Sequence, residues 1–335
     1  MSIRLTKYLI LTISALFVWL FIREIDWGIL YEQLDTIGSS LFLVLLLSAL
    51  AYACASTGWI LCFGNWSRLN KFNLYFLARQ VGESFGTLNP IGAVGGDALK
   101  YFLIRDQDSK PNKIIPSILC ARVVMWIAYV FLVIAVLVIS GGIVNQHATP
   151  FLSWVAIITL LGIACVLLVR SIYSLDWLYN ILTKITSKLN SKYLRLAQRK
   201  VLSTNYNLTK ITTHGKRYIY LALLFFVIHY LLGALEFYYI LLLLHEPISF
   251  VDAVIAEIGT SFVRSVVLFI PGQVGVEEFS NKFFLELAGV GNDKVWITVS
   301  IIRRIRQLCW MAISAIAYWF YFQRNVLIES NPKLS

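Results

Sequence analysis

The stretch "NPIGAVGGDALKYFLIR", residues 89–105, interrupts a strongly apolar chain with one proline, three glycines and an aspartate. A second interruption, "FIPGQVGVEEF", follows at residues 269–279. Proline removes a backbone donor and glycine permits unusual backbone dihedrals, so both stretches favour a break in a helix. Where such a break lies inside a membrane, the freed backbone groups have to be buried in protein or line a polar cavity.

The composition around these stretches is that of an integral membrane protein. Of 335 residues, 59% are hydrophobic and 14% are charged, a polar share too small to cover a soluble domain. Two apolar regions, 74–104 and 250–290, contain the interruptions and fit either re-entrant half-helix pairs or short tilted spans. We expect an all-α polytopic membrane protein with about six full spans and two broken helical regions. The full spans are predicted near 5–22, 41–63, 114–140, 150–170, 218–244 and 295–322.

Positive charge is concentrated in the connections between the apolar runs. The formal net charge is +11, and residues 170–217 hold ten Lys and Arg against one acidic residue, Asp176. This bias predicts a cytoplasmic connection. The spacing of apolar and basic residues near 177–202 is typical of an amphipathic helix on a membrane surface. We therefore expect anionic lipid, and no nucleic acid, at the basic cytoplasmic face, and both termini on the cytoplasmic side of the cell membrane.

The two interruptions match when Pro90 is aligned with Pro271. An acidic residue lies seven positions downstream of each proline, and an arginine, Arg122 or Arg303, lies thirty-two positions downstream. These shared offsets favour a degenerate internal duplication. Ordinary loops between short helices are the alternative for either stretch alone. The motif residues are Pro90, Gly92, Gly95, Gly96, Pro271, Gly272 and Gly275.

The duplication predicts one membrane domain, residues 1–335, with pseudo-repeats at about 41–140 and 218–322 joined by the basic connection 170–217. If each broken region returns to its own side of the membrane, the two regions enter from opposite sides. Inverted repeats with broken helices that meet near the midplane are common in secondary transporters.

Ionisable residues within apolar segments cost about 2.5–3.5 kcal/mol each for Arg, Lys or Asp at a helix centre, so they pair or face a wet cavity. Glu257 and Arg264 are seven positions apart on one helical face, which favours an ion pair that fixes helix packing. Arg122 and Arg303 have no acidic residue three or four positions away. A guanidinium in a cavity can hold a phosphate through two hydrogen bonds, and half-helices that begin after the glycines would add amide donors. The candidate substrate-binding residues are Asp97, Lys100, Arg122, Arg264, Glu277, Glu278, Arg303 and Arg304.

At these residues the chain resembles the transmembrane region of lysylphosphatidylglycerol synthases, a flippase-like family. The resemblance rests on "NPIGAVGGDALKYFLI" followed by "ARVVMW", and on "IPGQVGVEEFSNKFFLELAGV" followed by "IIRRIRQLCW". Two positions depart from the family pattern: Lys100 stands where an arginine is usual, and Ala121 precedes Arg122 where an acidic residue is expected. The resemblance implies movement of a lipid between leaflets and leaves the headgroup open.

We expect a lipid flippase or transporter that moves an anionic phospholipid, an aminoacyl-phospholipid or a polyprenyl-phosphate-linked lipid through a central polar cavity. Arg122 and Arg303, with Arg304, would hold the phosphate, and the acidic residues of the two motifs would balance them or meet a cationic headgroup. The alternatives are a membrane-embedded transferase for a lipid-linked substrate and a membrane partner of a separate lipid synthase. The sequence shows no catalytic constellation or metal-ligand spacing, so we expect no enzyme activity, no metal and no cofactor. If the protein forms an oligomer, we expect a homodimer.

Overall fold

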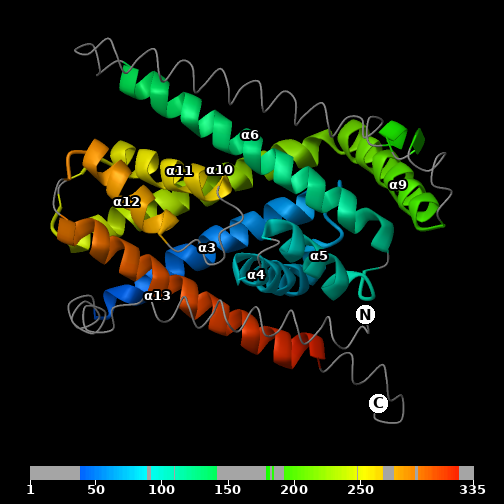
Figure 1. Ribbon diagram of the computed structural model, residues 1–335, viewed down its shortest axis with the longest axis horizontal. Helices are drawn as coiled ribbons and strands as arrows, with labels where there is room; N and C mark the ends of the chain where they lie inside the picture. The colour runs from blue at the N-terminus through cyan, green and yellow to red at the C-terminus, as the bar shows by residue number, and fades with distance from the viewer. Residues whose placement is uncertain are drawn as a thin grey trace. The chain divides into compact units, whose positions relative to one another are not determined.

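The computed structural model describes residues 38–88, 92–108, 110–141, 179–181, 183–184, 192–246, 248–266, 275–290 and 293–323. Within these ranges the regular structure is helical and contains no strand. The predicted spans near 5–22 and 150–170 lie outside the described residues, as do Pro90, Pro271 and Gly272. The long helices labelled in Figure 1 are α3 (Ser40–Leu61), α4 (Phe72–Leu88), α5 (Ala93–Ile104), α6 (Ile114–Gly141), α9 (Lys192–His214), α10 (Lys216–Leu243), α11 (Phe250–Val266), α12 (Val276–Leu287) and α13 (Asp293–Ala317).

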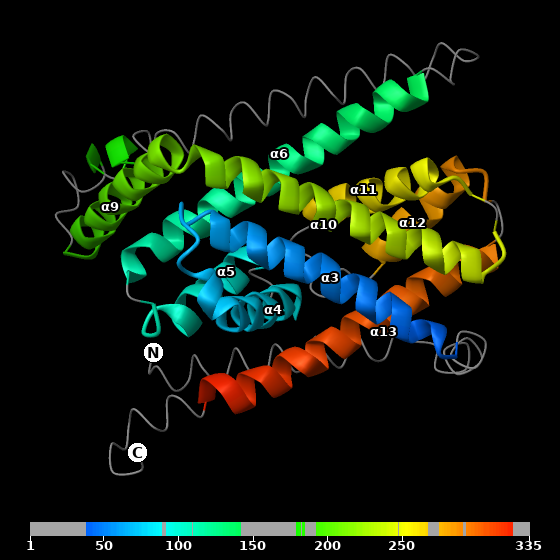
Figure 2. The ribbon, with the colours of Figure 1, turned by 180° about the vertical axis from the view of Figure 1, so that it is seen from behind.

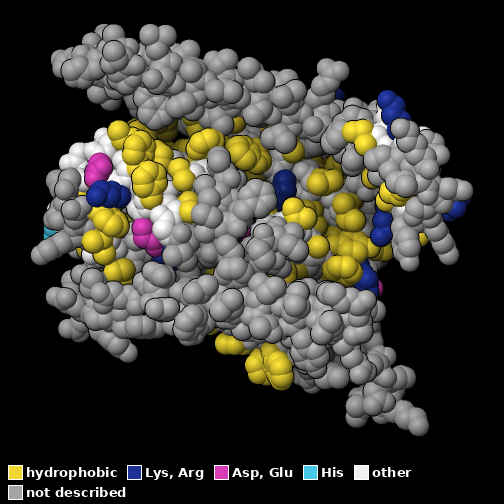
Figure 3. Space-filling model, viewed as in Figure 1, with side chains coloured by type: hydrophobic (Ala, Val, Ile, Leu, Met, Phe, Trp, Pro, Cys, Tyr) yellow, Lys and Arg dark blue, Asp and Glu magenta, His cyan; other side chains and the backbone are white. Residues whose placement is uncertain are grey.

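Among the described residues, three stretches are long and apolar enough to cross a membrane: Ser40–Leu61, Pro111–Val136 and Lys216–Leu243. They confirm the helices predicted at 41–63, 114–140 and 218–244. The region predicted as a span at 295–322 is also helical, since α13 continues into a π-helix over Tyr318–Gln323. On the face shown in Figure 3, most described side chains are hydrophobic, as expected of a surface that contacts lipid.

The described residues form two compact units. The first unit combines the beginning of α3, the pair α4 and α5, the end of α10, and helices α11, α12 and α13. The second unit combines the end of α3, α6, α9 and the beginning of α10. Both broken regions therefore belong to the first unit.

The break predicted within 74–104 is confirmed, because α4 ends at Leu88 and α5 begins at Ala93. The two helices run antiparallel and touch through their backbones. A methyl group on Gly96 would collide with the carbonyl group of Gly82, and one on Gly86 would lie 3.2 Å from the carbonyl oxygen of Gly92. Helix α5 thus begins before Gly95 and Gly96, and not after them as we expected. Gly96 lies inside the helix because the close approach to α4 leaves no room for a side chain.

The break predicted within 250–290 is confirmed as well, because α11 ends at Val266 and α12 begins at Val276. Gly275, just before α12, has a φ of +79°, a conformation that favours glycine. The antiparallel pair, side by side in Figures 1 and 2, meets through side chains: the ring of Phe284 lies over Gly259, and Thr260 Oγ1 lies 3.4 Å from Asn281 Oδ1. A layer of side chains therefore separates α11 from α12.

The first unit is held together by an apolar core and by polar contacts along α13. Trp310 of α13 donates a hydrogen bond from Nε1 to Ser48 Oγ of α3 at 2.8 Å. Ser84 Oγ of α4 donates to Ser314 Oγ of α13 at 2.9 Å. The core residues come from α3, α10, α11, α12 and α13 and include Val44, Phe237, Ile240, Ala256, Leu285, Val299 and Ile302.

In the second unit, a buried ion pair connects the segments that follow α3 and α5. Arg68 donates from Nε and Nη2 to the two carboxylate oxygens of Asp108 at 2.7 and 2.9 Å. Within the stretch 177–202, for which we predicted an amphipathic helix, all described residues are helical: 179–181, 183–184 and the beginning of α9, which covers Lys192–His214.

Candidate functional site

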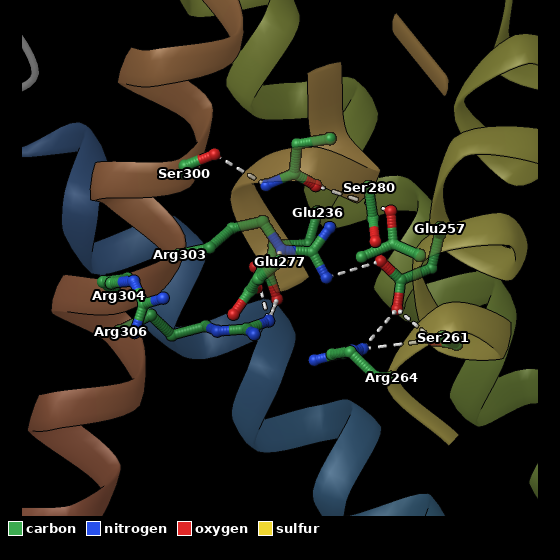
Figure 4. A network of polar contacts seen from close by, with 12 residues as sticks. Glu236, Glu257, Ser261, Arg264, Glu277, Ser280, Ser300, Arg303, Arg304 and Arg306 are labelled. Atoms are coloured by element: carbon green, nitrogen blue, oxygen red, sulfur yellow. Dashed lines mark hydrogen bonds and ion pairs between the residues drawn. The ribbon is translucent and has the colours of Figure 1, made fainter. Parts of the chain in front are cut away.

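Helices α10 to α13 bring four glutamates and four arginines together in the first unit (Figure 4). The two signs are therefore balanced when every group is ionised. Unpaired buried charges are strongly disfavoured, which explains why each carboxylate here has a guanidinium partner. The residues are Glu236 of α10, Glu257 and Arg264 of α11, Glu277 and Glu278 of α12, and Arg303, Arg304 and Arg306 of α13.

Arg303 lies at the centre of this group. Its side chain is 2% exposed and extends from α13 toward Glu257 and Glu277 (Figure 4). Nη2 donates to Glu257 Oε2 at 2.8 Å, and Nε lies 3.3 Å from Glu277 Oε1. The guanidinium carbon is 5.0 Å from the centre of the Phe237 ring, within range of a cation–π interaction. Arg303 therefore links α10, α11 and α12 to α13.

Arg264 is the arginine of the group with the largest exposed fraction, 26% of its side chain. Its Nη2 lies 3.7 Å from Glu257 Oε1 and donates to Ser261 Oγ at 3.1 Å. Ser261 in turn donates to Glu257 Oε1 at 3.3 Å. The ion pair predicted from the seven-residue spacing of Glu257 and Arg264 is confirmed.

Two further ion pairs extend the group. Arg306 Nη1 donates to both carboxylate oxygens of Glu236 at 2.6 Å. Arg304 Nε donates to Glu278 Oε1 at 2.5 Å, and Glu278 Oε2 accepts from the backbone N–H of Gly275 at 2.9 Å. Glu278 thus ties the first turn of α12 to α13.

The sequence reasoning missed the polar residues beside Arg303. Asn281 is fully buried, and its Nδ2 donates to Ser300 Oγ at 2.9 Å. One signal could have found it. Asn281 and Lys100 each lie ten positions after the prolines that the alignment superimposes, so the charged position of one motif has a polar counterpart in the other.

A second charged group lies on the α4–α5 pair. Lys100 Nζ donates to Glu83 Oε1 at 2.5 Å and to Asp97 Oδ1 at 2.9 Å. The lysine side chain is 6% exposed, and its methylene groups lie against Gly82. Glu83 lies outside both sequence motifs, and its approach to Lys100 depends on the glycine contact that closes the hairpin.

The eight predicted site residues are thus distributed over both units. Arg122 lies in α6, in the second unit, so its joint action with Arg303 on one phosphate stays a prediction. The other seven belong to the first unit. Arg264, Glu277, Glu278, Arg303 and Arg304 belong to the α10–α13 group, and Asp97 and Lys100 belong to the α4–α5 group.

The buried polar atoms of α13 that have no hydrogen-bond partner within the described part of the chain include Arg303 Nη1, Arg306 Nε and Gln307 Oε1. Residues three and four positions apart share one side of a helix, so two donors and one acceptor lie along the same side of α13. No group of three or more His, Cys, Asp or Glu within the described ranges could hold a metal ion.

Comparisons with known proteins identify the family. Neither the curated proteins nor the solved structures include a significant match to the chain. The family model described as "Lysylphosphatidylglycerol synthase TM region" matches residues 8–315, which include both interruptions and all the charged residues above. The apolar helices agree with that match, and the chain is a multi-pass membrane protein that belongs to the lysylphosphatidylglycerol synthase transmembrane-region family.

Proposed function

We propose that this protein moves a lipid with a phosphate-containing headgroup between leaflets, along a polar path formed by charged residues of the first unit. The observation that carries the proposal is the distribution of side chains on α5 and α12. Each of these short helices buries polar or charged residues and exposes large apolar ones. This distribution is the reverse of that of a water-soluble helix, and it suits a helix that faces lipid on one side and a polar interior on the other.

In α5, Gly96 and Lys100 are buried, whereas Val94 and Phe102 are 71% and 56% exposed. In α12, Glu277, Ser280 and Asn281 are buried, whereas the stacked rings of Phe279 and Phe283 are 64% and 47% exposed. The buried faces carry the charged groups described above.

The lengths of the helices support the internal duplication and the re-entrant hairpins. In each broken region a helix of 17 residues is followed by one of 12 residues. At 1.5 Å per residue, 12 residues extend about 18 Å, which is shorter than a hydrocarbon core of about 30 Å. Because the two arms of each hairpin are antiparallel, the chain returns to the side of the membrane from which it entered. The two hairpins are therefore candidates for the inverted, half-spanning elements of a transporter.

The charged groups are paired before any substrate arrives. A lipid phosphate can enter by replacing a carboxylate as the partner of an arginine, and Arg264 is placed to do this first because its side chain is the most exposed of the four arginines. The free donors on Arg303 and Arg306 and the acceptor on Gln307 would bind phosphate oxygens and headgroup hydroxyls further inside.

The test is movement of a labelled anionic phospholipid across liposomes that contain the purified protein. We expect Arg264→Gln to slow this movement by about tenfold or more, because a hydrogen bond to a charged group contributes roughly 1.5–3 kcal/mol. Lys282→Gln is the matched control, since Lys282 lies on α12 with 43% of its side chain exposed. Equal rates for Arg264→Gln and the wild type would contradict the assignment of Arg264.

Mass spectrometry of the same liposomes separates translocation from chemistry. Translocation leaves the lipid composition unchanged, whereas a transferase would convert a lipid-linked substrate into a new species. An absence of lipid movement in well-folded wild-type protein, together with co-purification of a lipid synthase, would instead support the role of a membrane partner.

A further inference from the structure

Helix α9 exposes basic and large apolar side chains on the same side. Leu196, Leu202 and Tyr206 are 49%, 54% and 69% exposed. With 3.6 residues per turn, the exposed basic residues fall on the same half of the helix; these are Arg195, Arg199, Lys200 and Lys210. The sequence contains no Asp or Glu from residue 192 to residue 217, so the segment does not balance its own charge.

The opposite side of α9 is docked against protein. Leu208, Ile211 and Thr212 are buried, and the helix packs against α6 and the short 3-10 turn Pro111–Lys113 that precedes it (Figure 2). A helix at a water-exposed surface normally buries its large apolar side chains. Helix α9 instead keeps two leucines and a tyrosine outside after its docking side is covered, and these side chains lie among the arginines and lysines.

The corner between α9 and α10 places this surface at a membrane boundary. Only Gly215 separates α9 from α10, and its backbone packs so closely on Ile211 and Gly64 that a side chain would not fit. Helix α10 is a candidate span from Lys216 onward, and the turn beneath α9 begins another candidate span at Pro111. Helix α9 therefore lies at the level where two spans start. An aromatic pair at the corner, Trp66 and Tyr218 with ring centres 5.8 Å apart, is typical of that level.

We propose that the exposed side of α9 binds anionic phospholipids of the membrane that holds the protein. The basic side chains contact the lipid phosphates, and Leu196, Leu202 and Tyr206 enter the headgroup layer between them. The exposed leucines and the position at the start of two spans favour a lipid surface over an acidic protein. This surface belongs to the second unit and does not depend on the proposed translocation.

The test places a polarity-sensitive NBD fluorophore on Tyr206→Cys in full-length protein that lacks its five native cysteines. The protein is inserted into nanodiscs of phosphatidylcholine, with or without phosphatidylglycerol. We expect phosphatidylglycerol to shift the emission to the blue and to raise it by about twofold. The increase should fall at 1 M salt, where the Debye length is about 3 Å.

The triple variant Arg195→Gln/Arg199→Gln/Lys210→Gln should lose the response to phosphatidylglycerol. Arg105→Gln is the control, because it removes an exposed basic residue of the same unit that lies outside α9. Equal emission in neutral and anionic nanodiscs, or a full response in the triple variant, would overturn the proposal. Since the readout is the environment of residue 206, it is independent of lipid translocation.

Discussion

At the scale of single residues, the Glu236–Arg306 pair shows how charge is kept inside this protein. The side chains are 3% and 11% exposed, and one guanidinium nitrogen contacts both carboxylate oxygens. A buried ion pair adds little net stability, because desolvation offsets the attraction. Removing one partner is a different case, since the other charge remains buried without compensation.

We therefore predict that Glu236→Leu lowers the free energy of unfolding by about 3–5 kcal/mol, and that Glu236→Leu/Arg306→Met restores most of that loss. Unfolding of the purified variants in detergent, arranged as a double-mutant cycle with Arg306→Met alone, gives the coupling energy. If the double variant were as unstable as Glu236→Leu, the uncompensated charge of Arg306 would not be the cause of the destabilisation.

Individual contacts were only partly predictable from the sequence. Glu257 and Arg264 share a helix, so their spacing was sufficient to predict the pair. Glu236 and Arg306 are 70 positions apart, and only the packing of α10 against α13 brings them together. For the same reason the two carboxylate partners of Arg303 could not be identified, although its burial cost required some partner.

At the scale of elements, α12 is an arm with an apolar outer side and a polar inner side. We predict that Phe279→Asp, on the outer side, reduces the amount of folded protein in the membrane fraction, because an aspartate facing hydrocarbon costs roughly 2.5–3.5 kcal/mol. Phe279→Leu is the control for the loss of the aromatic ring and should fold normally. If Phe279→Asp folded as well as Phe279→Leu, the outer side of α12 would face water.

The position of each break was predictable from proline and glycine, because these residues disfavour a continuous helix wherever they occur. The residue at which α5 begins was not predictable in this way. The local pattern predicts that the helix begins after Gly95 and Gly96, but both glycines lie within it. The contact between Gly96 and Gly82 depends on a second helix, which a local pattern cannot reveal.

At the scale of the whole molecule, the inverted-repeat hypothesis makes a prediction about sidedness. A cysteine at Asn70, between α3 and α4, should react with a membrane-impermeant maleimide only from the cytoplasmic side. A cysteine at Ser249, between α10 and α11, should react only from the outside. Both positions are exposed, and both variants are made in protein without native cysteines. Labelling of intact cells and of inverted vesicles distinguishes the two sides, and reaction of both positions from one side would exclude opposite entry of the hairpins.

The glycine contact between α4 and α5 has a mechanical consequence. Backbone atoms have no rotamers, so two helices that touch at Gly82 and Gly96 cannot slide past each other without separating. Helices α11 and α12 meet through Phe284, Thr260 and Asn281, side chains whose torsions can change while the helices stay in contact. In a working cycle we therefore expect the first hairpin, α4 and α5, to move as a rigid body. We expect changes in the distance between two paired helices to occur in the second hairpin, α11 and α12.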